Sequence, residues 1–369
     1  MIRHLLFTGL LLTVAGSVLA QMPERLYVYK VERITADQAP QLDGKLDEKV
    51  WQNRPQITAF RLFLGTPGMP TQPSEVTLIT DGTRLYIAEK FYDDDMANVL
   101  FNPARDPFWN DCTELYFDPR HDLSRSIQLV VDCGGRRWWQ KQNDDGWGWY
   151  ADSNFGVLAD WEAAAFRGPD YWSLEIAINA TSFEFTCTPG EVIRFNVCRF
   201  RLNPKKSEFS AWTYGPAGRQ KDMSAWGHLI FLGPGQSGAS DITEADIKLI
   251  YPDLGSRVVE VPVSGGFVTY TRADTQKQTF VELLTPPLKQ SEQYLGDAEE
   301  TIAKLPTTAR GLEALKAEVA KLKASLEGNQ ALVAQELTLA QYDQLREAVE
   351  TLRKSSETVY WRAQILALI

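Results

Sequence analysis

Cysteine, histidine and methionine are scarce in this sequence, which has four Cys, three His and five Met among 369 residues. His4 lies in the N-terminal apolar segment, and His121 and His228 form no metal-ligand pair and no triad pattern. There is no G-x-S-x-G, P-loop or G-x-G-x-x-G pattern, and no pair of carboxylates in a recognisable glycosidase motif. A hydrolase whose two acids face each other across a cleft stays open as an enzyme alternative, and haem binding is disfavoured.

Basic residues are outnumbered by acidic ones, 38 to 48. Residues 1–20 hold one Arg and no acid, so the rest of the chain carries 37 basic against 48 acidic side chains, or −11. Nucleic acids and anionic membrane surfaces both select for basic patches. The charge therefore argues against both partners, whereas a neutral glycan needs no such patch.

Long apolar runs are missing except at the N-terminus. Arg3 precedes an apolar run over residues 5–18, and the small residue Ala20 follows it. This is the three-part pattern of a cleavable secretory signal. The run is shorter than the ~20 residues of a membrane span. We expect residues 1–20 to be removed and the protein to be secreted or periplasmic, without membrane insertion; an uncleaved anchor is the alternative.

An even number of cysteines in an exported chain permits two disulfides, with three possible connectivities. The residues are Cys112, Cys133, Cys187 and Cys198. If residues 114–118 and 127–132 form a hairpin, Cys112 and Cys133 fall roughly opposite each other. Four buried free thiols are the alternative.

Short segments rich in β-formers, separated by turn residues, run from residue 34 to about residue 232. This pattern predicts an all-β sandwich or barrel within residues 21–235, after a lead-in strand over 21–33. The predicted strands are 75–79, 85–91, 113–117, 126–131, 172–178, 192–200 and 228–232.

The C-terminal third differs in composition. Residues 236–285 are expected to form either a small β extension or a linker, and the predicted strands there are 248–251, 257–263 and 266–272. Residues 286–369 carry apolar positions every three or four residues, which predicts two long amphipathic helices and a shorter one. Gly328-Asn329 is the expected turn, and Thr338 with Gln341 is a candidate capping box. A helical hairpin within one chain is favoured, and a coiled-coil device for self-association or a protein partner is the alternative.

Six ordered pieces of the sequence resemble family 9 carbohydrate-binding modules, within the DOMON-like sandwiches. They cover about 200 of the 369 residues. The pieces are 42–51 (LDGKLDEKVW), 76–88 with its Asp81 and LYIA, 111–119 (DCTELYFDP), 171–178 (YWSLEIAI), 194–199 (RFNVCR) and 226–231 (WGHLIF).

The resemblance implies an antiparallel, jelly-roll-like β-sandwich that holds a sugar between two tryptophans. Phe108 and Trp109 lie where the first is expected, whereas residues 220–222 (QKD) offer no aromatic for the second. Some family members hold structural calcium, for which residues 93–95 (DDD) are candidate ligands here. No other cofactor is expected.

The eleven tryptophans fall into groups by context. Trp51, Trp172 and Trp226 lie within the matched pieces and are predicted to be core anchors, while a dense run of Trp, Gly and charge at residues 136–150 is either an aromatic platform or a satellite hydrophobic cluster. The candidate carbohydrate-binding residues are Phe108, Trp109, Trp138, Trp139, Trp147, Trp149, Trp212 and Tyr214, with Trp161 less secure.

Sugar rings present C–H-rich faces that pack on aromatic side chains, and their hydroxyls need polar partners. The sequence therefore favours an exported, non-catalytic protein that binds a carbohydrate through stacked aromatics. The alternative is a structural or interaction protein of the cell envelope, in which the sandwich is a scaffold and the helices bind a partner.

Overall fold

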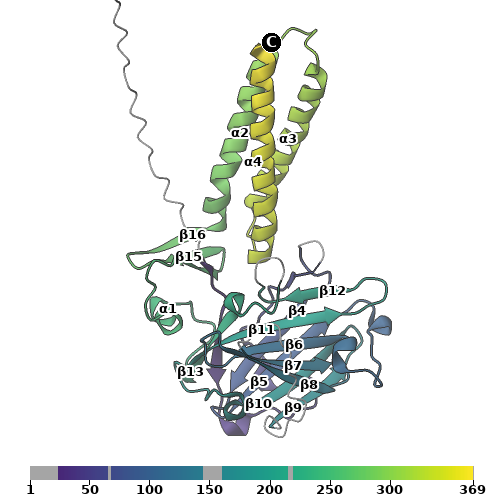
Figure 1. The fold of residues 1–369 in the computed structure, drawn as a ribbon, viewed down its shortest axis with the longest axis vertical. Helices are drawn as coiled ribbons and strands as arrows, with labels where there is room; N and C mark the ends of the chain where they lie inside the picture. The colour runs from purple at the N-terminus through teal and green to yellow at the C-terminus, as the bar shows by residue number, and fades with distance from the viewer. Residues whose placement is uncertain (1–23, 65–67, 144–159, 215–218, 369) are drawn as a thin grey trace, which may run out of the picture.

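The computed structural model describes residues 24–64, 68–143, 160–214 and 219–368, and Figure 1 shows a β-rich body from which three long helices project. Residues 1–20, Trp147 and Trp149 lie outside the described residues, so the expected signal segment and two candidate site residues are not placed.

One large sheet forms most of the body. Its strands are β2 (Val28–Arg33), β3 (Arg61–Leu62), β4 (Ser74–Thr80), β5 (Arg84–Tyr92), β6 (Cys112–Asp118), β7 (Arg125–Asp132), β8 (Arg137–Asn143), β9 (Trp161–Arg167), β10 (Tyr171–Asn179), β11 (Val192–Arg201), β12 (Glu208–Ala211) and β13 (Gly227–Pro234). The order is β8-β7-β6-β11-β13-β2-β4-β5-β10-β9, with β12 and β3 continuing from β11. Pairing is mostly antiparallel, but β2 runs parallel to both β13 and β4. Each strand predicted between residues 75 and 232 is present.

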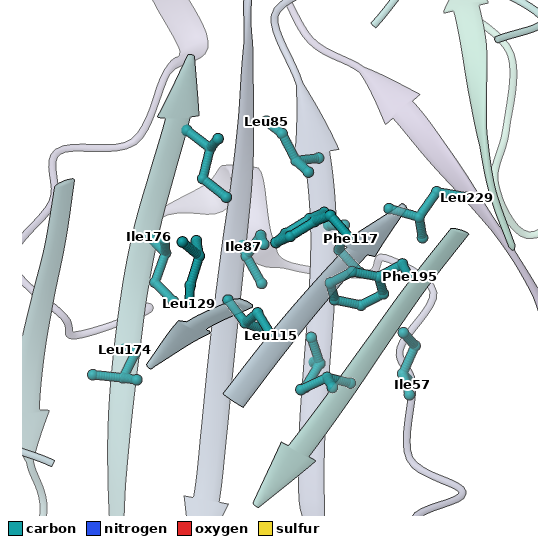
Figure 2. Packing of buried hydrophobic residues seen from close by; sticks show 14 of the residues in the cluster. Ile57, Leu85, Ile87, Leu115, Phe117, Leu129, Leu174, Ile176, Phe195 and Leu229 are labelled. Carbon is teal, nitrogen blue, oxygen red and sulfur yellow. The ribbon is translucent and has the colours of Figure 1, made fainter. Parts of the chain in front are cut away.

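The sheet folds over one main apolar core. Alternate residues of β5 and β10 face alternate residues of β6, β7 and β11, so each strand contributes one of its two faces (Figure 2). Full burial of each such side chain contributes about 1.5–3 kcal/mol. The core residues include Leu85, Ile87, Leu115, Phe117, Leu129, Leu174, Ile176 and Phe195, all fully buried. The strands thus pack face to face over this core, as predicted for a β-sandwich.

The opening segment that resembles family 9 modules is fastened to the body by a carboxylate. Trp51 Nε1 donates to Glu175 Oε1 at 2.8 Å, and the backbone N–H groups of Asp43 and Gly44 donate to Glu175 Oε2. Gly44 has φ +82°, and a Cβ there would lie 2.5 Å from the backbone carbon of Ala165. Trp51, Trp172 and Trp226 are all buried, as predicted for core anchors.

A second, four-stranded sheet lies between the body and the helices (Figure 1). It consists of β1 (Glu24–Arg25), β14 (Val259–Val263), β15 (Gly266–Tyr270) and β16 (Thr275–Thr279). The predicted strand at residues 248–251 is wrong, because this region belongs to helix α1 (Glu244–Ile250). Thr243 caps that helix, and its side chain and that of Asp246 form a capping box.

The helices are α2 (Phe280–Ala303), α3 (Leu312–Val333) and α4 (Leu339–Leu368). All three are long, and α2 starts before the expected boundary at residue 286 because Thr279 and Glu282 form a capping box there. The expected turn at Gly328-Asn329 is also wrong, since α3 continues to Val333. The predicted pairing of Thr338 with Gln341 is present. None of the helices in the described ranges combines the length and apolarity needed to cross a bilayer.

The helices are joined to the body by a charged contact, next to an aromatic contact between α2 and α4. Asp343 in α4 accepts two hydrogen bonds from Arg25 Nη1, at 2.8 and 2.9 Å, and forms an ion pair with Arg61 of β3. Beside it, the rings of Phe280 and Tyr342 stack with centroids 4.4 Å apart. Because Asp343 is 4% exposed, this joint is part of the buried structure.

The predicted disulfides are absent, because all four cysteines are buried free thiols. Cys112 lies opposite Asp132 in the β6–β7 register, not opposite Cys133. Since consecutive strand residues point to opposite faces, Cys133 turns into the apolar core, away from Cys112.

Candidate functional site: an aromatic platform beside a polar sheet face

Three of the predicted aromatic residues meet at one end of the body. Trp109 ends a short helical turn (Pro107–Trp109), and 57% of its surface is exposed. Its ring centroid lies 5.6 Å from that of Phe108, which in turn lies 5.7 Å from that of Trp138 with the planes at 78°. We call Phe108, Trp109 and Trp138 the aromatic platform.

A pocket of about 430 Å³ opens beside the platform. It is lined by Ala104, Arg105, Asp106 and Trp109. The lining of the pocket therefore combines an aromatic, a basic and an acidic residue. This combination matches what a sugar requires, a flat apolar contact and polar partners for hydroxyl groups.

The other predicted site residues lie elsewhere. Trp139 points to the opposite face of β8 from Trp138 and packs against the apolar core. Trp212 is 6% exposed, with Tyr27 and Phe195 each 6.1 Å away between ring centroids, so its expected place on the ligand surface is corrected to a place in the core.

Two further aromatic residues, Tyr214 and Trp161, also lie away from the aromatic platform. Tyr214 is half-buried against a small cluster that contains Tyr116 and Trp226. Trp161 is 4% exposed in the main core. Of the aromatic residues proposed from the sequence, Trp109 lines the pocket, and Phe108 and Trp138 continue the aromatic surface beside it.

A polar row that the sequence analysis did not identify runs next to the platform. Trp138 lies opposite Val130 in the β7–β8 register, and Val130 lies opposite Glu114 in the β6–β7 register, so the three share one sheet face. Gln140 Nε2 donates to Gln128 Oε1 at 2.6 Å on that face. The Tyr116 hydroxyl donates to Glu114. We call Glu114, Tyr116, Gln128 and Gln140 the polar face.

Burial shifts the charges of the polar face. Desolvation raises the pKa of Glu114, although the hydrogen bond from Tyr116 and the charge of Lys221 act in the opposite direction. Desolvation likewise lowers the pKa of Lys221, against the attraction of Glu114. Both shifts disfavour the charged forms of these groups, because the polar face is buried.

The candidate calcium ligands are engaged by side chains of this chain. Asp93 accepts from Arg201 Nε at 2.7 Å and Nη2 at 2.8 Å, and Asp94 accepts from Arg201 at 3.0 Å. Asp95 accepts from Asn98 and Lys205. Arginine and lysine already neutralise these carboxylates, and the described part of the chain contains no group of three or more His, Cys, Asp or Glu placed to hold a metal ion.

Similar solved structures include a family 9 carbohydrate-binding module from Caldicellulosiruptor kristjanssonii, in complex with glucose and in complex with cellotriose. These are 16% and 15% identical to this chain, cover 59% of it and 100% of the module, and superpose with a TM-score of 0.42. A Bacteroides uniformis protein, provisionally described as carbohydrate-binding, is 13% identical over 55% of this chain and 98% of its own, with a TM-score of 0.43.

No family model matches the chain, and no curated protein matches it. The sugars in the two module structures are ligands of those modules.

Proposed function

We propose that this protein binds a poly- or oligosaccharide at the aromatic platform, without chemical conversion of the sugar. The observation that carries the proposal is the exposed indole of Trp109 in a pocket shared with Arg105 and Asp106. A sugar ring lies flat on the indole, and its hydroxyl groups exchange hydrogen bonds with the guanidinium and carboxylate at the rim.

The surroundings of the pocket support the same role. Phe108 and Trp138 extend the apolar surface from Trp109 toward the sheet. Behind Trp138, the polar face consists of buried amide, hydroxyl and carboxyl groups that are hydrogen-bonded to one another. We propose that these groups select an uncharged ligand, since an ionised sugar would have to lose its hydration beside buried groups.

Export is part of the proposal, and it rests on the N-terminal sequence pattern. An exported protein meets polysaccharides outside the cytoplasm.

The test is a glycan-array and polysaccharide pull-down screen of residues 21–369, followed by titration of each hit. The variant Trp109→Ala is expected to weaken binding about tenfold or more, in line with the loss of a stacked aromatic anchor. Trp361→Ala is the matched control, because Trp361 is exposed to a similar extent (55%) but lies near the end of α4. Equal binding by both variants would exclude the platform as the site.

An interaction protein is the second candidate, and one observation favours it. Trp361, Ile365 and Leu368 are exposed by 55%, 56% and 86% at spacings of four and three along the end of α4. Such a stripe is suited to a protein partner or to self-association. Absence of glycan binding by the wild type, together with loss of a protein partner in Trp361→Ala, would favour this candidate.

A further inference from the structure

We propose that Arg136, fixed by the buried carboxylate of Asp132, is a positioning residue that holds the loop carrying Trp109 in its binding arrangement. The inference rests on the proposed carbohydrate function and deepens it. Arg136 does not line the pocket, so it would affect ligand binding only through the position of the loop.

The guanidinium of Arg136 donates hydrogen bonds to several backbone carbonyl groups of this loop. Nη1 donates to the carbonyl oxygen of Pro103 at 2.7 Å, and Nη2 donates to the carbonyl oxygens of Asn102 and Arg105. Its Cζ atom also lies 5.6 Å from the ring centroid of Phe101. One side chain therefore contacts four residues of the segment that leads to Trp109.

The buried carboxylate of Asp132 holds Arg136 in place. Its Oδ2 atom accepts from Arg136 Nε and its Oδ1 atom accepts from the Arg136 backbone N–H, both at 2.9 Å. Oδ1 also accepts from Gly134 N–H, and Oδ2 from Asn110 Nδ2 at 2.8 Å. The carboxylate is fully buried and has four donors, so it is saturated in this arrangement.

Asn110 closes the loop at its other end. Its Oδ1 atom accepts from the backbone N–H of Asn102 at 2.8 Å. Asp132 thus binds Arg136 and Asn110 at once, and the two together hold the loop from Asn102 to Asn110.

The side chain of Trp109 has little support of its own. More than half of its surface is exposed, and the aromatic ring that it contacts in the described part of the chain, Phe108, belongs to the same loop. The position of the indole therefore depends on the loop backbone. Holding that backbone before the ligand arrives removes an ordering cost from binding, which is the general basis of preorganisation.

The first experiment compares Arg136→Lys with the wild type in the full chain after removal of residues 1–20. Lysine keeps the charge and loses the planar fork that reaches several carbonyl groups. We expect binding of the best glycan from the array to weaken about tenfold, with unchanged thermal midpoint within a few degrees. Arg257→Lys is the matched control, since Arg257 is an exposed arginine paired with Glu24 at the small sheet.

A double-mutant cycle with Trp109→Ala shows whether Arg136 acts through the indole. If it does, Arg136→Lys has little further effect once Trp109 is gone. The same loss of affinity in both backgrounds would overturn the proposal, because Arg136 would then act independently of Trp109.

Amide hydrogen exchange of residues 101–110 gives a readout that needs no ligand. Exchange there is expected to rise in Arg136→Lys and to stay unchanged in Arg257→Lys; no rise would overturn the proposal. If the wild type binds no glycan, the proposed function fails, and this measurement alone decides whether Arg136 holds the loop.

Discussion

Glu89 is a carboxylic acid inside the apolar core, and replacing it by Gln is expected to stabilise the protein at neutral pH. It lies on β5 between Ile87 and Phe91 in the core face, with no exposed surface. Thr113 Oγ1 donates to Glu89 Oε1 at 2.9 Å, and Oε2 has no hydrogen-bond partner. Burial raises the pKa of Glu89 from 4.5 to about 8, although the bond from Thr113 acts in the opposite direction.

The sign and size of the effect follow from proton linkage. With a folded-state pKa above the unfolded one, Glu89 keeps its proton in the folded chain and loses it in the unfolded chain as pH rises above 4.5. Folded stability contributed by this group is therefore present below pH 4.5 and falls until about pH 8. At 1.36 kcal/mol per pH unit, the loss between pH 4.5 and pH 7 is about 3 kcal/mol.

Glu89→Gln removes the titration and keeps the size and an acceptor for Thr113. Urea unfolding of both proteins from pH 4.5 to pH 8 gives the difference in free energy of unfolding at each pH. We expect the variant to gain about 3 kcal/mol on the wild type between pH 4.5 and pH 7. A difference that stays constant over this range would refute the reasoning, since it would mean that Glu89 ionises normally in the folded state.

Three further measurements test other parts of the structure. Burial, reinforced by the charge of Arg194, lowers the pKa of His121 to about 4. The contribution of the neutral imidazole to stability is therefore present above pH 6.5 and is lost as pH falls toward 4. Between pH 7 and pH 5, the free energy of unfolding of His121→Asn should fall less than that of the wild type. Asp343→Ala should cost about 3 kcal/mol in urea unfolding, because it leaves two arginines without their buried partner. Because the four cysteines are free thiols, dithiothreitol should leave the thermal midpoint unchanged, and a fall of several degrees would contradict the structure.

Sequence patterns predicted β4 to β7, β10, β11 and β13, because these strands are largely buried segments bounded by turn residues. They did not predict β3, β8, β9 and β12. They failed at residues 248–251, where lone β-formers fall in the short helix α1 that begins at a capping box. They also placed a helix end at Gly328-Asn329, although packing of α3 against its neighbours carries the helix past both residues.

The site was predicted in part. Phe108, Trp109 and Trp138 were identified by residue type, but the same reasoning also selected Trp212, which the core contains. Residue type cannot distinguish the two, because burial of an aromatic ring depends on which side chains the fold packs against it, here Tyr27 and Phe195 for Trp212. The polar face had a readable signal in the alternation of residues 126–130 (SIQLV), where Gln128 lies between core positions and thus on the opposite face.

The Asp343 joint has a mechanical consequence. Helix α4 has 30 residues, about 45 Å of helix, and its first turns are clamped through one buried carboxylate to two arginines outside the helices. A helix of this length that is fixed at one end transmits force and orientation, whereas a flexible linker does not. A partner bound at Trp361, near the far end of α4, would therefore hold the β-rich body at a distance and an orientation that the helix sets (Figure 1).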